Sequence, residues 1–170
     1  MVVCQRGMKV MVGKMKSTTI YLVGFPGTGK YTIAKEIAQR ANYRLVDNHL
    51  INNSLFSIIQ MEGNQALPDK VWTNISQIWD VVLDTMSHVS PKEYNFVMTN
   101  ALFDGDPGDV RLFNKIQATA ESRQSLFVPV KLVISDLEEH KRRITTQERK
   151  GRFKDVNPDS PLNYFKHDKV

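Results

Sequence analysis

The 170-residue sequence contains a single cysteine, Cys4, and no long run of apolar residues. One cysteine cannot form an internal disulfide, so a disulfide-held secreted scaffold is excluded and we expect a cytoplasmic location. A helix that crosses a bilayer needs about 20 apolar residues, and the lack of such a run excludes an integral membrane protein. Hydrophobic residues make up 41% of the chain and charged residues 24%, which argues against wholesale disorder and predicts one globular domain.

Acidic residues are missing from the first sixteen positions, which hold four basic residues. Residues 17–140 hold 10 basic and 14 acidic residues, and residues 141–170 hold 9 basic and 4 acidic ones. The formal net charge of +5 therefore comes from the two ends of the chain. A basic cluster that is confined to one segment indicates a local anion site at least as well as a nucleic-acid surface.

Residues 1–16 form a basic leader whose apolar runs are short and broken by Lys and Arg. This pattern lacks the apolar core of a signal peptide, and we expect a disordered leader followed by a single domain over 17–170.

Predicted strands alternate with predicted helices along this domain. Runs of β-branched and aromatic residues predict strands at 18–23, 43–47, 95–99 and 126–134. Apolar residues at helical spacing predict helices at 30–41, 50–61, 70–89, 110–123 and 136–149. The alternation predicts an α/β fold of three layers, with a parallel sheet and helices on both faces.

Two details of these elements carry expectations of their own. Pro129 cannot donate a backbone hydrogen bond, so it should lie near the start of its strand or beside a bulge. Trp72 and Trp79 are seven residues apart and share a helix face, for which we favour core or interface packing over ligand stacking.

The run GFPGTGKYT is the strongest chemical signal. Two glycines five residues apart, followed by a lysine, lie between a predicted strand and a predicted helix, which is the arrangement of a phosphate-binding loop. Its backbone N–H groups and the helix N-terminus form an anion-binding nest, and Lys30 adds charge for the β- and γ-phosphates. A tight turn that binds nothing is the disfavoured alternative. The predicted nucleotide-binding residues are Gly24, Pro26, Gly27, Thr28, Gly29, Lys30, Tyr31 and Thr32.

One position departs from the usual form of this loop. The residue after the lysine normally supplies a hydroxyl ligand for Mg²⁺, but here it is Tyr31, and a threonine comes one position later. Thr32 is better placed for the α-phosphate. Mg²⁺ would then be held through water, a carboxylate or the phosphates themselves, since this ion commonly keeps several waters.

With this loop, a short second strand that ends in Asp47, and a basic segment after a late helix, the chain resembles the small P-loop kinases over about residues 18–152. That superfamily includes nucleoside monophosphate kinases, shikimate and gluconate kinases and chloramphenicol phosphotransferase-like proteins. The form GFPGTGK without a following hydroxyl is most similar to its uncharacterised kinase-like branch. The resemblance implies ATP and Mg²⁺ as cofactors.

In these kinases the acceptor lies near the ends of the second and third strands. The resemblance puts Asp47 there, where it would act as the base for the acceptor hydroxyl or hold Mg²⁺ through water. Thr32 is the second candidate ligand of Mg²⁺. A helix-capping role for Asp47 is an equal alternative. His49 is more consistent with packing than with a base, and Asn100 stands where many P-loop proteins carry a metal-binding acid. Asp104 and Asp106 favour a structural role in a turn.

The family's closing lid carries arginines that stabilise the transferring phosphoryl group, which implies a lid at about residues 142–158. Arg149 and Arg152 are the candidates, alongside Lys30 and Asp47 as catalytic residues. A solvated basic helix end is the alternative. Family members continue into a fifth strand, and no such strand is predicted before Val170.

These observations leave three functions in competition. The leading one is an ATP-dependent kinase that phosphorylates a hydroxyl of an unidentified small molecule. The second is a nucleotide-binding or NTPase regulatory module, which the poor metal ligands Tyr31 and Asn100 favour. A nucleic-acid-end kinase ranks lowest because aromatic residues scarcely interleave with the basic ones. The sequence leaves the acceptor, the choice of ATP or GTP and the oligomeric state open.

Overall fold

The computed structural model describes residues 17–59, 67–150 and 154–166. The disordered-leader expectation and Arg152 lie outside these ranges. The described elements follow one another in the order β1 (Ser17–Val23), α1 (Lys30–Ala41), β2 (Tyr43–Asp47), α2 (Asn48–Phe56), α3 (Asp69–Asp84), the π-helical turn η1 (Thr85–Val89), β3 (Asn95–Asn100), α4 (Pro107–Ser122), β4 (Ser125–Lys131), α5 (Leu137–Ile144), α6 (Gln147–Lys150) and α7 (Ser160–Lys166).

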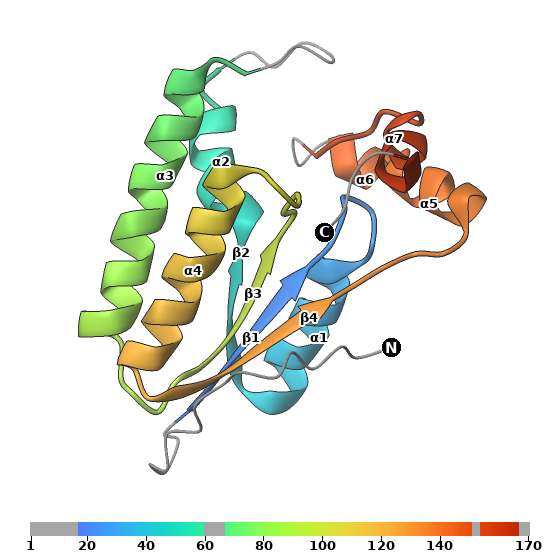
Figure 1. The fold of residues 1–170 in the computed structure, drawn as a ribbon. Helices are drawn as coiled ribbons and strands as arrows, with labels where there is room; N and C mark the ends of the chain where they lie inside the picture. Colours follow the sequence, from blue (N-terminus) through green and yellow to red (C-terminus); the bar gives the residue numbers. More distant parts are fainter. Residues whose placement is uncertain (1–16, 60–66, 151–153, 167–170) are drawn as a thin grey trace.

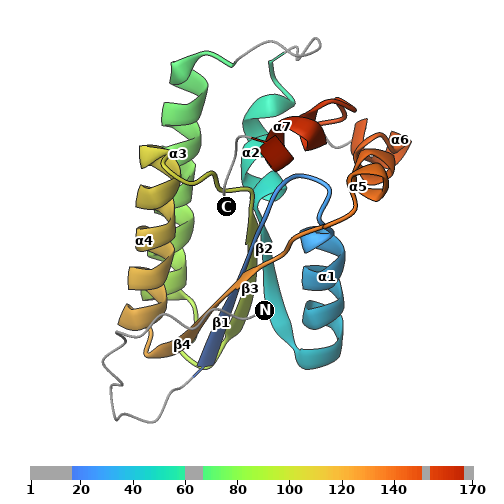
Figure 2. The ribbon, with the colours of Figure 1, turned by 45° about the vertical axis from the view of Figure 1, so that its right-hand side comes forward.

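The four strands form one parallel sheet in the order β2-β3-β1-β4. Helix α1 covers one face of this sheet, and α3 and α4 cover the other (Figure 1). Helices α5, α6 and α7 gather beyond the carboxyl ends of the strands, beside the loop that leads into α1 (Figure 2). The three-layer α/β fold predicted from the sequence is therefore confirmed. Within the described ranges, no helix is long and apolar enough to span a membrane.

Strand β1 shows why the core has two halves. Tyr21 and Val23 belong to the larger apolar cluster, on the side of α3 and α4, while Leu22 packs with Ala34 of α1 on the other side. Successive side chains of a strand point to opposite faces, so a strand with helices on both faces is apolar at almost every position. The apolar run IYLV meets this need in the half of the strand that leads into the glycine-rich loop.

The two tryptophans of α3 have different surroundings. Trp79 is buried in the larger core cluster, which confirms core packing for that residue. Trp72 is half exposed, makes an edge contact with Phe56 at 6.2 Å between ring centroids, and lines the cleft described below. The end of α3 that carries Trp72 lies beside α2, away from the sheet, whereas Trp79 lies within the core cluster (Figure 1).

Several elements differ from the sequence expectation, and three of the differences lie in β4 and the helices after it. Strand β4 ends at Lys131 rather than at residue 134, and Val133 is exposed, so the apolar run outlasts the sheet. Pro129 lies inside β4 without a bulge at the Tyr21 pairing position, because β4 is an edge strand and one of its sides needs no donor. The expected helix up to residue 149 is split into α5 and α6.

Candidate active site

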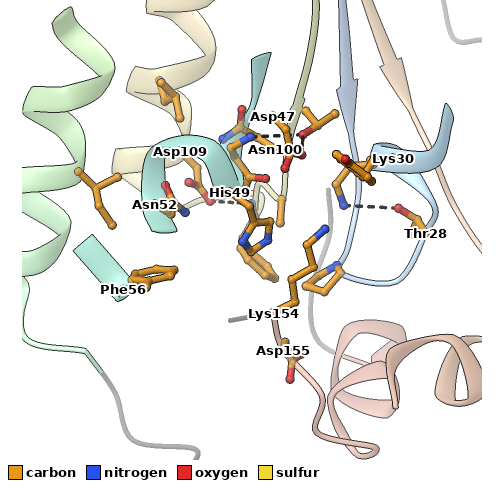
Figure 3. Close-up of a pocket in the computed structure, with 18 of the residues that line it drawn as sticks. Thr28, Lys30, Asp47, His49, Asn52, Phe56, Asn100, Asp109, Lys154 and Asp155 are labelled. Carbon is orange, nitrogen blue, oxygen red and sulfur yellow. Dashed lines mark hydrogen bonds between the residues drawn. The ribbon is translucent and has the colours of Figure 1, made fainter. Parts of the chain in front are cut away.

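A cleft of about 2060 Å³ opens at the carboxyl ends of β1, β2 and β3. Its walls come from the loop between β1 and α1, from the starts of α2 and α4, from α3, and from the segment 142–160 (Figure 3). Crevices at the carboxyl ends of parallel strands are the usual ligand sites of open α/β sheets. A pocket for one small ligand measures about 300–1,000 Å³, so this cleft has room for two ligands.

The loop from Gly24 to Gly29 can form only with glycine at particular positions. A Cβ on Gly24 would lie 2.4 Å from the carbonyl oxygen of Leu132, which is far closer than atoms can approach. Gly27 and Gly29 have φ of +91° and +89°, a left-handed conformation that favours glycine. Residues 26–32, which include all the predicted nucleotide-binding residues except Gly24, line the cleft.

Lys30, the first residue of α1, folds back over this loop. Its Nζ donates hydrogen bonds of 2.7 Å to the carbonyl oxygens of both Gly24 and Phe25. The pKa of Lys30 is lowered to about 7, mainly by burial and then by the nearby cations Arg149 and Lys154. The Asp47 carboxylate opposes this shift with a smaller effect. A cation held at such a low pKa gains free energy when an anion enters.

Asp47 and Thr99 meet across the ends of β2 and β3. The Thr99 hydroxyl donates a 2.5 Å hydrogen bond to Oδ1 of the buried Asp47, 52 residues away in the chain. Asp47 stands at the N-cap position of α2, yet its side chain makes no capping hydrogen bond. The capping alternative is therefore wrong. The carboxylate instead sits on the cleft wall beside Lys30 (Figure 3).

Two asparagine oxygens in the cleft wall are buried without a partner. Neither Oδ1 of Asn100 nor Oδ1 of Asn52 has a hydrogen-bond partner among the residues that the structure describes. A buried polar atom without a partner is unfavourable by about 1–3 kcal/mol, and it commonly marks a place where a ligand or water binds.

His49 lies beside Asp47 in the first turn of α2. Burial is the main cause that lowers its pKa to about 4, and the nearby Lys154 adds to the effect. Its Nδ1 is 3.3 Å from Oδ1 of Asn53. The imidazole is therefore neutral near pH 7, in keeping with the packing role expected for it.

The basic segment forms the wall opposite α3. Arg142, Arg143 and Arg149 line the cleft, as the resemblance implies for a lid. Arg142 and Arg143 both bind Glu139 on the surface of α5. Arg149 is more enclosed: its Nε and its Nη2 donate to the carbonyl oxygen of Asp155 at 3.1 and 2.9 Å. Burial lowers the pKa of Arg149.

Three residues of the C-terminal part of the chain contact the loop or the first turn of α1 and were missed by sequence reasoning. The imidazole Nε2 of the buried His140 is 2.6 Å from the carbonyl oxygen of Pro26 in the loop. The ring of Tyr164 stacks on Phe25 with 4.6 Å between centroids. Lys154 places its ammonium 4.9 Å from the ring centroid of Tyr31. These residues lie more than 100 positions from the loop, and no sequence spacing connects them to it.

The far end of the cleft, toward α3 and α4, is different in character. Asp109 accepts a hydrogen bond from the Phe103 backbone, and burial raises its pKa. Asp106 caps α4 through the N–H groups of residues 108 and 109, which confirms its structural role. Lys115 at this end is paired with Asp80 at 2.5 Å. The far end is lined by the acids Asp69, Asp106 and Asp109, the bases Arg111 and Lys115, the amides Asn48, Asn52 and Gln77, and the aromatic residues Phe56, Trp72 and Trp79.

The donor set fits a protein-held Mg²⁺ poorly. Tyr31, in the usual place of the metal-ligating hydroxyl, turns its ring toward a lysine. In the part of the chain that the structure describes, no three His, Cys, Asp or Glu side chains gather closely enough to hold a metal. Thr32 is exposed at the cleft edge, and Asp47 is already bonded to Thr99. These residues suit a metal that is carried by phosphates and water better than one that is held by side chains.

Comparison with known proteins supports the fold. No protein-family model matches the sequence, and no curated protein matches it either. Among solved structures, the chain is similar to a putative kinase from Chloroflexus aurantiacus J-10-fl, with a TM-score of 0.55 and 16% identity over 82% of this chain and 71% of that one. It is also similar to shikimate kinase from Acinetobacter baumannii in complex with shikimate, with a TM-score of 0.52 and 17% identity over 88% and 74% of the two chains. The chain therefore has the fold of the small P-loop kinases.

Proposed function

We propose that the protein is a phosphotransferase that moves the γ-phosphoryl group of ATP to a hydroxyl of a small molecule. The observation that carries this proposal is one continuous cleft, in which a phosphate-binding loop and a buried carboxylate, Asp47, border a second space large enough for an acceptor. The fold shared with kinases supports the same reaction class.

Each group in the cleft would have a distinct role. The loop amides and Lys30 hold the β- and γ-phosphates, and Arg149 with Arg152 of the basic segment offsets the charge that spreads over the phosphoryl oxygens during transfer. The acceptor oxygen forms a bond to the γ-phosphorus while the bond to the β–γ bridging oxygen breaks, which releases ADP. Asp47 takes the proton of the hydroxyl, and Thr99 holds the carboxylate in place.

Mg²⁺ is proposed to enter with the nucleotide and to offset part of the phosphate charge. Thr32 and Asp47 are the side chains that we expect to hold it, and both line the cleft. Contact through water suits them best, because Asp47 is engaged with Thr99 and the adjacent Tyr31 offers no aliphatic hydroxyl.

A first experiment tests nucleotide binding by calorimetry with ATP and GTP. Lys30→Ala should abolish binding, because it removes the cation that folds over the loop. Lys35→Ala, on the exposed side of the same helix, is the matched control and should bind as the wild type does. If the wild type bound neither nucleotide, the proposal would fail.

A nucleotide-binding regulatory module is the second candidate function. The Arg149 guanidinium, which is already occupied by the carbonyl of Asp155, favours it, because an arginine fixed in this way is less free to follow a reaction. ATP hydrolysis that no hydroxyl compound accelerates, together with a partner that binds only one nucleotide state, would support this module over the kinase.

A further inference from the structure

The side chain of Lys154 enters the nucleotide end of the cleft from the C-terminal segment. Figure 3 shows it extending between His49 and Lys30, toward the ends of the strands. Its ammonium lies over the ring of Tyr31, 4.9 Å from the centroid, which is within the range of a cation–π interaction. Tyr31 is the residue that follows the loop lysine, where a hydroxyl ligand for Mg²⁺ usually stands.

The charge of Lys154 lowers the pKa values of neighbouring groups. Both Lys30 and His49 have pKa values that the Lys154 ammonium helps to lower, after the larger effect of burial. Arg149 acts on Lys30 in the same direction. Two cations that act on Lys30 in this way disfavour its charged form without an anion, and a polyphosphate that binds among them would favour it.

The backbone around Lys154 is tied to the loop rather than extended into solvent. The Lys154 N–H donates to the carbonyl oxygen of Arg149, and the Asp155 carboxylate accepts a 2.8 Å hydrogen bond from the Tyr164 hydroxyl. The Tyr164 ring in turn stacks on Phe25 in the loop, 4.6 Å away and within 8° of parallel. Lys154 is thus positioned by contacts on both sides of it.

We infer that Lys154 binds the phosphates of the nucleotide, and that Tyr31 holds it there in the place of a metal-ligating hydroxyl. The inference rests on the proposed function, since it concerns the same nucleotide site. An ammonium supplies part of the charge that a side-chain-held Mg²⁺ would supply. ATP binding should therefore persist when Mg²⁺ is removed, and it should depend on Lys154 most strongly in that condition.

The test is calorimetric titration of ATP into the full chain, once with excess Mg²⁺ and once with a chelator. On chelation, the ATP affinity of the wild type should fall by less than about tenfold. In the chelator, Lys154→Met should bind ATP about tenfold or more weakly than the wild type, the loss expected for one charge-assisted phosphate contact. Lys35→Met, a surface lysine outside the cleft, is the matched control and should match wild type in both conditions.

Substitutions at Tyr31 separate the proposed role of the ring from general damage to the loop. Tyr31→Leu should weaken ATP binding in the chelator as Lys154→Met does, and Tyr31→Phe, which keeps the ring, should restore the affinity. Tyr31→Ser supplies a hydroxyl and should make binding strongly dependent on Mg²⁺. Thermal unfolding of each variant shows whether the fold is kept.

A second readout does not depend on the metal. If Lys154 lies beside Lys30 in solution, Lys154→Met should raise the pKa of Lys30 above its value of about 7, which the pH dependence of amine labelling at Lys30 measures. If Lys154→Met behaves as Lys35→Met does in both readouts, the inference is wrong. The kinase proposal still stands in that case, provided that the wild type binds ATP. Wild type that binds no ATP in either condition would overturn both.

Discussion

The two ends of the cleft differ in both charge and construction. The phosphate end carries the cations Lys30, Arg149 and Lys154, and its loop comes from one uninterrupted stretch of chain. The far end is lined by three carboxylates, two bases, several amides and three aromatic rings that come from α2, α3, α4 and the loop before α4. The first end has an excess of cations that attracts polyphosphate, whereas the far end carries mixed charge.

This difference indicates how one cleft could keep donor and acceptor apart. A polyphosphate is attracted to the end with the excess of cations, and the far end, with its mixed charge, offers no comparable attraction. The buried carboxylate Asp47 lies where the two ends meet, within the influence of Lys30. The predictions below alter one end at a time, beginning with the boundary between them.

The largest effect is expected at that boundary. Asp47→Asn keeps the size of the side chain but removes the base, and turnover of an accepted hydroxyl compound should fall by about 10²–10⁴-fold. Coupled measurement of ADP release with and without acceptor checks this result. Unchanged turnover would mean that Asp47 is not the base.

A backbone change at the phosphate end should disrupt the loop. Gly24→Ala would put a Cβ 2.4 Å from the Leu132 carbonyl oxygen, and we expect a loss of about 1–3 kcal/mol in unfolding free energy together with weakened ATP binding. Gly105→Ala is the matched control: its φ of +85° is also left-handed, but no atom lies within 4 Å. Equal losses in both variants, measured by denaturant unfolding, would show that the contact with Leu132 is unimportant.

The low pKa of Lys30 makes nucleotide affinity depend on pH. Lys30 in the free protein loses its proton as the pH rises through about 7, while a bound polyphosphate raises its pKa, so the complex holds more protons than the free protein. ATP affinity should therefore fall above pH 7, by at most about tenfold per pH unit. Titrations from pH 7 to 9 should show this slope in wild type, and Lys30→Arg should remove it.

The smallest effect is expected at the far end. An acceptor that carries an amine should have a lower KM than an isosteric hydroxy acid, because the exposed carboxylate of Asp69 lines this part of the cleft. Asp69→Asn should raise the KM for the amine by about fivefold, the value of a partly exposed ion pair. Asp84→Asn lies on the same helix outside the cleft and should leave it unchanged, and a preference for the hydroxy acid would contradict the comparison.

Whether a feature is formed by one local stretch of chain or by distant segments decides whether the sequence predicts it. Strand β2 and helix α1 have the predicted bounds, because local patterns of apolar residues determine them. The loop after β1 stands out in the sequence because a phosphate-binding loop requires glycine and lysine at fixed local spacing. Helix α7 was missed, since its seven residues are too few to show a helical period.

Contacts between distant segments could not be read in this way. The sequence left Asp47 with a capping role as an equal alternative, because its contact with Thr99, 52 residues later, depends on the pairing of β2 with β3. Lys154 is one more base in a charged tail of the sequence, because its contact with Tyr31 joins segments more than 100 residues apart. The acceptor end is assembled from isolated residues of several elements, and no motif marks it.

Transfer of the γ-phosphoryl group tests the central claim most directly. The protein would be incubated with ATP labelled at the γ-phosphate and with matched amino alcohols, neutral polyols and hydroxy acids, and the labelled products would be separated. The account predicts label on an organic hydroxyl, formed faster than free phosphate and most readily with an amino alcohol. Free phosphate as the sole labelled product with every compound, from a protein that binds ATP, would contradict it.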